Sequence, residues 1–145
     1  MSNDLHVTLS PRLSKLYDLA TMVEEFGDEH GLPLPKVFVI NLALDEVITN
    51  AVTHGSFENA SDPKIEVHLR VDHDVLTLTI EDNGSMFDPT IDTEPDTESS
   101  LQRRGVGGLG LHLVKSFADR VSYEFVGGKN RLTLEHDLKP ATNRK

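Results

Sequence analysis

Hydrophobic residues recur along this chain with two different periods, and these periods divide the chain into strands and helices. Apolar and polar residues alternate in residues 5–9, 65–71 and 76–80, which predicts three half-buried strands. Two further strands are predicted at residues 121–126 and 131–138 near the end of the chain. The sequence therefore predicts five strands, four of them in adjacent pairs.

Helical spacing of apolar residues appears in three other segments. The first helix is expected to follow Ser10-Pro11, with Ser10 as its N-cap and Pro11 as its first residue, and to end at Gly31. The second is expected over residues 35–54, and the third is expected to start near Gly108. The predicted order is β-α-α-β-β-loop-α-β-β.

Turn signals join the paired strands into hairpins. Asp72-His73-Asp74 connects one pair, and Gly127-Gly128-Lys129-Asn130 connects the other. Sequential hairpins together with long helices predict an α+β fold, a two-layer α/β sandwich with a mostly antiparallel mixed sheet and helices packed on one face. We expect one domain over residues 1–145, with an ordered core at 4–138 and a flexible tail at 139–145.

Composition and charge narrow the range of functions. The chain has 145 residues, 24 Asp and Glu against 14 Lys and Arg, a net charge of −10 and no cysteine. This acidic balance argues against a nucleic-acid or anionic-membrane surface, because phosphate groups require clustered cations. The absence of cysteine excludes disulfides, thiolate metal sites and thiol nucleophiles. We find no signal-peptide pattern and no apolar run of about 20 residues, and therefore expect a cytoplasmic protein without a membrane span.

The second predicted helix carries an unusual polar stripe. Glu46, Asn50 and His54 lie at i, i+4 and i+8 on a helix that is otherwise apolar almost all round. A solvated polar face is one explanation. The other is that Glu46 and Asn50 face a pocket, where a carboxylate suits a general base and an amide oxygen suits a hard cation such as Mg²⁺.

Two glycine-bearing segments follow this helix. Asp82-Asn83-Gly84 is either an ordinary Asx turn or a place where the Asp82 carboxylate accepts an exocyclic amine and Gly84 admits a flat ring. Residues 85–105 then have almost no periodicity. Four glycines in residues 105–110 open the third helix, either as a hinge or as a phosphate site built from free backbone N–H groups. They match neither a Walker loop nor a Rossmann fingerprint.

In this order, the three motifs resemble the Bergerat (GHKL) ATP-binding fold shared by gyrase, the Hsp90 chaperone, histidine kinases and the mismatch-repair ATPase. Within that superfamily the chain looks like the bacterial anti-sigma-factor serine/threonine kinases of the RsbW and SpoIIAB type. The matching segments are LALDEVITNAVTHG, IEDNGSMFDP, RRGVGGLGLHLVKSFAD and GGKNRLTLEHDL. The resemblance covers roughly residues 5–138.

The resemblance implies a role for each matching residue. Glu46 would be the general base, and Asn50 would be the Mg²⁺ ligand. Asp82 would recognise the adenine amino group, Gly84 would lie under the ring, and Thr133 would help to hold adenine beside Asp82. Residues 85–105 would form the ATP lid. The remaining nucleotide-binding positions would be Met86, Arg104, Gly105, Gly107, Gly108, Leu109 and Gly110.

The implied function is a regulatory kinase. It would bind Mg·ATP, phosphorylate a Ser or Thr of an anti-anti-sigma (STAS-type) partner, and hold a sigma factor when that partner is absent. The family's usual Asp-x-Gly-x-Gly box has Met86 in place of its second glycine, which puts the lid geometry and the chemistry in question. The alternative is therefore a non-catalytic, nucleotide-dependent binding switch in the same system. A homodimer is a further family expectation.

Two other ATP-dependent functions fit the sequence less well. The catalytic half of a sensor kinase would need an upstream dimerisation helix with a phosphoacceptor histidine, and only His6 and His30 precede the motif helix. An ATPase of the gyrase or chaperone kind would need further domains that 145 residues cannot hold.

The distribution of charge adds an expectation about metal. No Lys or Arg occurs in residues 37–63 or 71–102, which contain Glu46, Asn50 and Asp82. Bound phosphates would need other positive partners, namely Mg²⁺, the glycine-opened helix start and the arginines at the end of the lid. The sequence therefore predicts strict metal dependence of nucleotide binding.

Overall fold

A computed structural model describes residues 3–54, 57–58, 60–88, 115–116 and 118–138. The elements in chain order are β1 (Asp4–Leu9), the 3-10 helix η1 (Leu13–Lys15), α1 (Leu16–His30), α2 (Leu34–His54), β2 (Ile65–Asp72), β3 (Val75–Asp82), β4 (Arg120–Val126) and β5 (Lys129–Asp137). Residues 115–116 are helical, within the third predicted helix. The start of that helix, most of the predicted lid and the predicted tail lie outside the described residues.

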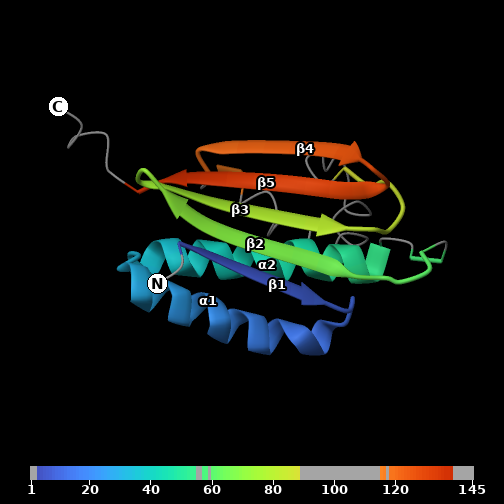
Figure 1. The fold of residues 1–145 in the computed structure, drawn as a ribbon, viewed down its shortest axis with the longest axis horizontal. Helices are drawn as coiled ribbons and strands as arrows, with labels where there is room; N and C mark the ends of the chain where they lie inside the picture. Colours follow the sequence, from blue (N-terminus) through green and yellow to red (C-terminus); the bar gives the residue numbers. More distant parts are fainter. Residues whose placement is uncertain (1–2, 55–56, 59, 89–114, 117, 139–145) are drawn as a thin grey trace, which may run out of the picture.

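The five strands form one sheet in the order β1-β2-β3-β5-β4, and all four pairings between them are antiparallel. Helices α1 and α2 lie together on one face of this sheet (Figure 1). The predicted two-layer α+β sandwich is confirmed. Among the described strands the sheet is antiparallel throughout rather than mixed, because the neighbouring strands run as hairpins or return in the opposite direction.

The hydrophobic core lies between the sheet and the two helices α1 and α2. Alternate residues of the strands point to the same face, so one set of side chains from each strand is buried. Burying one such side chain contributes roughly 1.5–3 kcal/mol. The most completely buried members are Leu19 and Val23 of α1, Ile40, Ala43, Leu44 and Ile48 of α2, Ile65, Val67 and Leu69 of β2, Leu76 and Leu78 of β3, and Leu134 of β5.

Two-residue turns set the register of both hairpins. His73 and Asp74 join β2 to β3 with φ of 51° and 64°, and Gly127 and Gly128 join β4 to β5 with φ of 63° and 76°. Positive φ at both central residues is the geometry that matches the twist of paired strands. The second turn is therefore shorter than the four-residue turn predicted from the sequence. Its last two predicted residues belong to β5 instead, and Asn130 becomes a strand residue.

The start of α1 also differs from the prediction. The α-helix begins at Leu16 rather than at Pro11, and η1 precedes it. Arg12 is extended, with φ −134° and ψ 134°, and its N–H donates to the Ser10 carbonyl at 2.7 Å. The chain therefore turns once before it becomes helical. The predicted end is confirmed, because Gly31 adopts a left-handed conformation with φ 64° at the C-cap.

Helix α2 is buried on most of its sides, as its apolar sequence predicts. It packs against α1 as well as against the sheet. Three residues with polar or charged side chains are buried in the described part of the chain, and Glu46 of α2 is one of them. In spite of this apolar character, the described residues contain no helix that is both long and apolar enough to cross a membrane.

Candidate functional site

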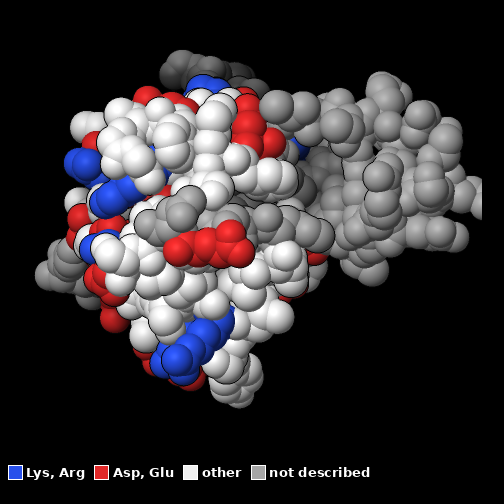
Figure 2. All heavy atoms as spheres, turned by 90° about the vertical axis from the view of Figure 1, so that its right-hand side faces the viewer, with Lys and Arg blue, Asp and Glu red and all other residues white. Residues whose placement is uncertain are grey.

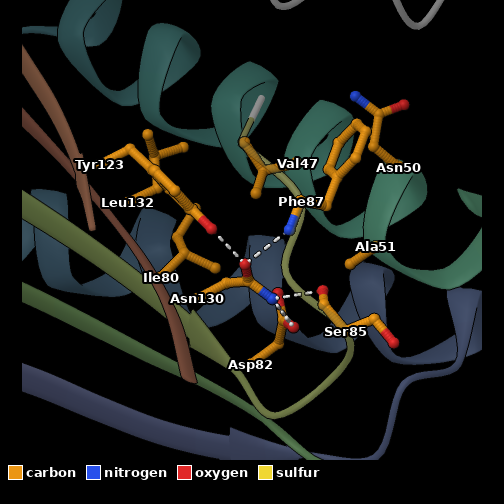
Figure 3. Close-up of a pocket in the computed structure, with 10 residues that line it drawn as sticks. All are labelled: Val47, Asn50, Ala51, Ile80, Asp82, Ser85, Phe87, Tyr123, Asn130 and Leu132. Carbon is orange, nitrogen blue, oxygen red and sulfur yellow. Dashed lines mark hydrogen bonds between the residues drawn. The ribbon is translucent and has the colours of Figure 1, made fainter. Parts of the chain in front are cut away.

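One end of the sandwich gathers the polar residues that the sequence singles out. Strand β3 ends there at Asp82, β5 begins there, and α2 reaches its C-terminal end there (right-hand side of Figure 1). A pocket lies between these elements (Figure 3). Its lining comes from α2, β3, β4, β5 and the segment after β3, and consists of Val47, Asn50, Ala51, Ile80, Asp82, Ser85, Phe87, Tyr123, Asn130 and Leu132.

The antiparallel register of β3 and β5 places Asn130 directly opposite Asp82. The Asn130 Nδ2 group donates a hydrogen bond to Asp82 Oδ1 at 2.9 Å, and the Gly84 N–H donates to the same oxygen at 2.9 Å. The described residues supply no hydrogen-bond donor to the other oxygen, Oδ2. The carboxylate is therefore held through one oxygen, and the second has free acceptor capacity.

Asn130 makes further bonds to the segment that follows β3 (Figure 3). Its Nδ2 group donates to the Ser85 carbonyl at 2.9 Å and, at 3.4 Å, to the Gly84 carbonyl. Its Oδ1 accepts from the Phe87 N–H at 2.9 Å and from the Tyr123 hydroxyl. The side chain is only 6% exposed, and both ends of its carboxamide are fully used.

Sequence reasoning did not find Asn130, because it assigned this residue to the turn between β4 and β5. A signal was present. Two adjacent glycines are sufficient for a two-residue hairpin turn, and that choice would have placed Asn130 second in the following strand. Phe87 and Tyr123 were missed as well, since the resemblance implies no role for either.

The predicted position of Thr133 beside Asp82 is not found. Thr133 pairs with Thr79, three residues along β5 from Asn130. Successive strand residues point to opposite faces, and Asn130 and Leu132 are on the buried face of β5. Thr133 therefore lies on the other face of the sheet, and Asn130 occupies the place beside Asp82.

Asn83 holds the end of β3 from its other side. Its Oδ1 accepts from the Lys64 N–H at 2.9 Å, and its Nδ2 group donates to the Asp62 carbonyl at 2.8 Å. The loop before β2 is thereby tied to the Asp82-Asn83-Gly84 turn. The two interpretations of Asp82-Asn83-Gly84, an ordinary Asx turn and a binding position, are therefore compatible, since the segment is an Asx turn at the edge of a pocket.

Met86 was predicted to take the place of a glycine at the nucleotide site. The structure leaves its side chain 65% exposed, outside the pocket lining. The next residue, Phe87, lines the pocket in its place, and the ring lies near Asn50 and α2 in Figure 3. The substitution of methionine for glycine is therefore accommodated by pointing the side chain outward.

Glu46 is a buried carboxylate on the α2 stripe that also carries Asn50. It is 7% exposed, and its Oε2 has no hydrogen-bond partner in the described part of the chain. Burial, and to a lesser extent the charge of neighbouring Asp45, raise the pKa of the Glu46 carboxyl. A buried acid with a raised pKa and a free oxygen has the properties of a general base. It lies one helical turn from Asn50, which lines the pocket, although Glu46 itself does not.

Acidic side chains lie near the centre of this end of the molecule, where most of the described surface is uncharged (Figure 2). Figure 2 looks directly onto it and shows Asp and Glu near the middle, with most Lys and Arg in view toward the margins. The described residues include no group of three His, Cys, Asp or Glu side chains that could hold a metal ion.

Several predicted phosphate-site residues cannot be placed. They lie outside the described residues, as does the side chain of His54. The positions concerned are Arg104, Gly105, Gly107, Gly108, Leu109 and Gly110.

Comparison with known proteins shows which family the chain belongs to. The family model described as the histidine kinase-like ATPase domain matches residues 9–135. The serine/threonine-protein kinase BtrW of Bordetella bronchiseptica is 35% identical over 103 residues, which cover 71% of this chain and 72% of BtrW. The anti-sigma F factor of Bacillus velezensis is 25% identical over 131 residues, covering 86% of this chain and 84% of that protein.

A solved structure shows a similar fold. The structure of the RsbU and RsbW domains of Rv1364c from Mycobacterium tuberculosis superposes with a TM-score of 0.67 at 20% identity. The match covers 97% of this chain and 34% of the mycobacterial chain. At this identity the likeness concerns the fold, and it agrees with the two-layer sandwich described above.

The raised pKa of Glu46 leads to a stability prediction. In the folded protein Glu46 retains its proton to higher pH than in the unfolded chain, so its ionisation destabilises the fold as pH rises above about 4.5. We expect Glu46→Gln, measured without nucleotide, to increase the free energy of unfolding at pH 7.5 by on the order of 1 kcal/mol. The gain should shrink as pH falls to 4.5 and below, because the carboxyl then becomes protonated in the unfolded chain as well as in the folded protein.

Urea denaturation at several pH values measures this difference. Glu25→Gln is the matched control, because Glu25 is an exposed carboxylate on α1 and should give no pH-dependent gain. A Glu46→Gln protein no more stable than the wild type at pH 7.5 would show that burial of this charge carries no cost.

Proposed function

Because the chain belongs to the histidine kinase-like ATPase family, we propose that it is an ATP-dependent serine/threonine kinase of the anti-sigma-factor type. Relatives named serine/threonine-protein kinase and anti-sigma F factor support this proposal. The observation that carries it is the buried carboxylate of Glu46, with its free oxygen and raised pKa, one turn from the pocket that Asp82 and Asn50 line.

The adenine ring would bind in the pocket beside Asp82. Oδ2 is the oxygen with free acceptor capacity, so it would accept a hydrogen bond from the exocyclic amine. Ile80 and Leu132 provide apolar surface for the ring, and Ala51 provides it from α2. An apolar pocket with a few placed polar groups is the usual form of a small-molecule site.

The phosphates would extend from this pocket toward Asn50. The Asn50 side chain lines the pocket, and its amide oxygen is a suitable ligand for Mg²⁺. A bound Mg²⁺ would neutralise phosphate charge in this acidic part of the surface. Arg104, Gly105, Gly107, Gly108, Leu109 and Gly110 would contact the phosphates in the same proposal, and residues 85–105 would form the lid.

The chemical step needs a base and correct alignment. The hydroxyl oxygen of the partner's Ser or Thr would form a bond to the γ-phosphorus while the bond to the bridging oxygen of ADP breaks. Glu46 would accept the hydroxyl proton, for which its raised pKa is suited. The products are ADP and a phosphorylated partner.

The partner would be an anti-anti-sigma protein of the STAS type. When that partner is absent, the kinase would hold a sigma factor. A homodimer in the cytoplasm is part of the same proposal. The net charge of −10 supports a protein partner rather than direct contact with nucleic acid or membrane.

A non-catalytic switch is the second candidate, and Met86 favours it. A methionine replaces the glycine of the family box at the entrance to the lid, and the side chain is exposed. If this residue prevents the lid from reaching its catalytic position, nucleotide would bind without phosphoryl transfer.

Glu46→Gln separates chemistry from binding. A pull-down with and without Mg·ATP, analysed by mass spectrometry, identifies the partner, and transfer is then followed with labelled ATP. We expect the variant to bind ATP with an affinity close to that of the wild type and to lose transfer by a factor of about 100 or more, because it lacks a proton acceptor. Glu25→Gln should transfer normally.

Unchanged transfer by Glu46→Gln would show that another group is the base. Wild-type protein that binds ATP yet leaves the captured partner without phosphate would favour the switch over the kinase.

Nucleotide affinity should depend on Mg²⁺. We expect EDTA to weaken ATP binding to the wild type by about tenfold or more, since few cations are present to offset the phosphate charge. Asn50→Ala should bind more weakly and respond less to EDTA. Isothermal titration with and without Mg²⁺ measures both effects, and a wild-type affinity unchanged by EDTA would contradict the metal assignment.

A further inference from the structure

Asn130 is the most highly connected polar side chain of the site, and none of the residue roles implied by the resemblance falls on it. It contacts three separate parts of the pocket, namely Asp82 at the end of β3, the segment Ser85–Phe87, and Tyr123 of β4. We propose that Asn130 is a positioning residue that couples recognition of the adenine ring by Asp82 to the placement of the Ser85–Phe87 strap. The inference rests on the proposed function, because it assumes that Asp82 receives the base.

The first half of this coupling concerns Asp82. A carboxylate at a strand end can rotate, and each rotation would change the direction of its free oxygen. Here Oδ1 accepts from Asn130 at 2.9 Å and from the Gly84 N–H at 2.9 Å, so rotation of the carboxylate would break two hydrogen bonds. Asp82 is thereby pre-organised, which lowers the entropy lost when a ligand binds to Oδ2.

The second half concerns the strap, which we define as Ser85–Phe87. Asn130 donates to the carbonyl of its first residue and accepts from the N–H of its last residue, each at 2.9 Å. The carboxamide thus pairs with the strap as the peptide group of a neighbouring strand would. A hydroxyl or an apolar side chain at this position could not reach both ends of the strap while also bonding to Asp82.

The Phe87 N–H fixes which way the amide points, because a backbone N–H can only donate. This N–H and the Tyr123 hydroxyl both donate to Oδ1, and a flipped amide would place an N–H group opposite the Phe87 donor. The Tyr123 pKa is raised, chiefly by burial, so the phenol stays protonated. The nitrogen of Asn130 is therefore directed at Asp82 and Ser85, as the coupling requires.

One consequence is reciprocal. If Asn130 links the two parts, then a ligand on Asp82 stabilises the strap, and a disturbed strap weakens the ligand. Loss of the link should reduce affinity for a purine with a 6-amino group more than affinity for one without it.

Asn130→Asp is the sharpest test, because it keeps the size of the side chain and replaces the donating nitrogen with oxygen. The new carboxylate would face Asp82 Oδ1 and the Ser85 carbonyl, both of which are acceptors. We expect ATP affinity at pH 8 to fall by about tenfold or more, and the preference for ATP over inosine triphosphate to approach one. Affinity should recover partly near pH 5, where the two carboxyls can share a proton.

Asn83→Asp is the matched control. It adds the same charge one residue from Asp82 and removes a bond to the Asp62 carbonyl, yet it has no bond to Asp82 or to the strap. It should preserve the preference for ATP. Thermal melting of each variant shows whether it is folded, and Tyr123→Phe should give a smaller loss of preference in the same direction.

A second readout does not depend on nucleotide. Hydrogen exchange of the Phe87 amide should be about tenfold faster in Asn130→Asp than in wild type, because repulsion from Asp82 Oδ1 and the Ser85 carbonyl displaces the carboxylate that would accept from this amide. The exchange rate should be unchanged in Asn83→Asp. A folded Asn130→Asp protein with the wild-type preference for ATP, or with wild-type Phe87 exchange, would overturn the inference. If the wild type binds neither nucleotide, the proposed function fails, and the exchange rates alone decide whether Asn130 holds the strap.

Discussion

The geometry of the site depends on the pairing of Asp82 with Asn130 across β3 and β5. No hairpin turn joins β3 to β5, so the register that sets Asp82 opposite Asn130 depends on how the two strands pack. A shift of β5 by one residue would turn Asn130 to the opposite face and bring Arg131 inward. The alternating core residues of β5 prevent that shift, since Leu132 and Leu134 would then leave the core. Core packing thus determines the position of a polar side chain.

A second constraint is the burial of charge on an apolar helix. Glu46 lies among the core residues of α2 with a free oxygen, a position in which an ionised group is costly. Such positions concentrate at functional sites, where a raised pKa serves proton transfer. The extensive core around Ile48 and Leu44 offsets the cost. The site therefore combines an adenine pocket of well-determined geometry with a carboxylate whose burial is unfavourable when it is ionised.

Hydrophobic periodicity was sufficient to predict the element order, the helical layer and the end of α1. It was not sufficient where local hydrogen bonds decide the backbone, as at Arg12, where the chain turns before α1 begins. The site was predicted in part. Asp82, Gly84 and Asn50 were found through motifs, whereas Asn130 was missed because β5 begins two residues before the predicted strand, so a residue assigned to the turn is a strand residue. Thr133 was placed beside Asp82 on the resemblance alone, and the alternation of faces along β5 puts it on the opposite side of the sheet from Asn130.

The end of the sandwich containing Asp82 and Asn130 is the proposed binding site for Mg·ATP. Two-dimensional NMR of labelled protein tests it most directly, because backbone and side-chain amides report separately. Mg·ATP should shift the amides of Gly84 and Phe87 and the Asn130 side-chain amide, while Gly31 at the end of α1 should be unaffected. Saturating nucleotide that leaves these three signals unchanged, or that shifts residues elsewhere instead, would show that Mg·ATP does not bind at this end of the sandwich.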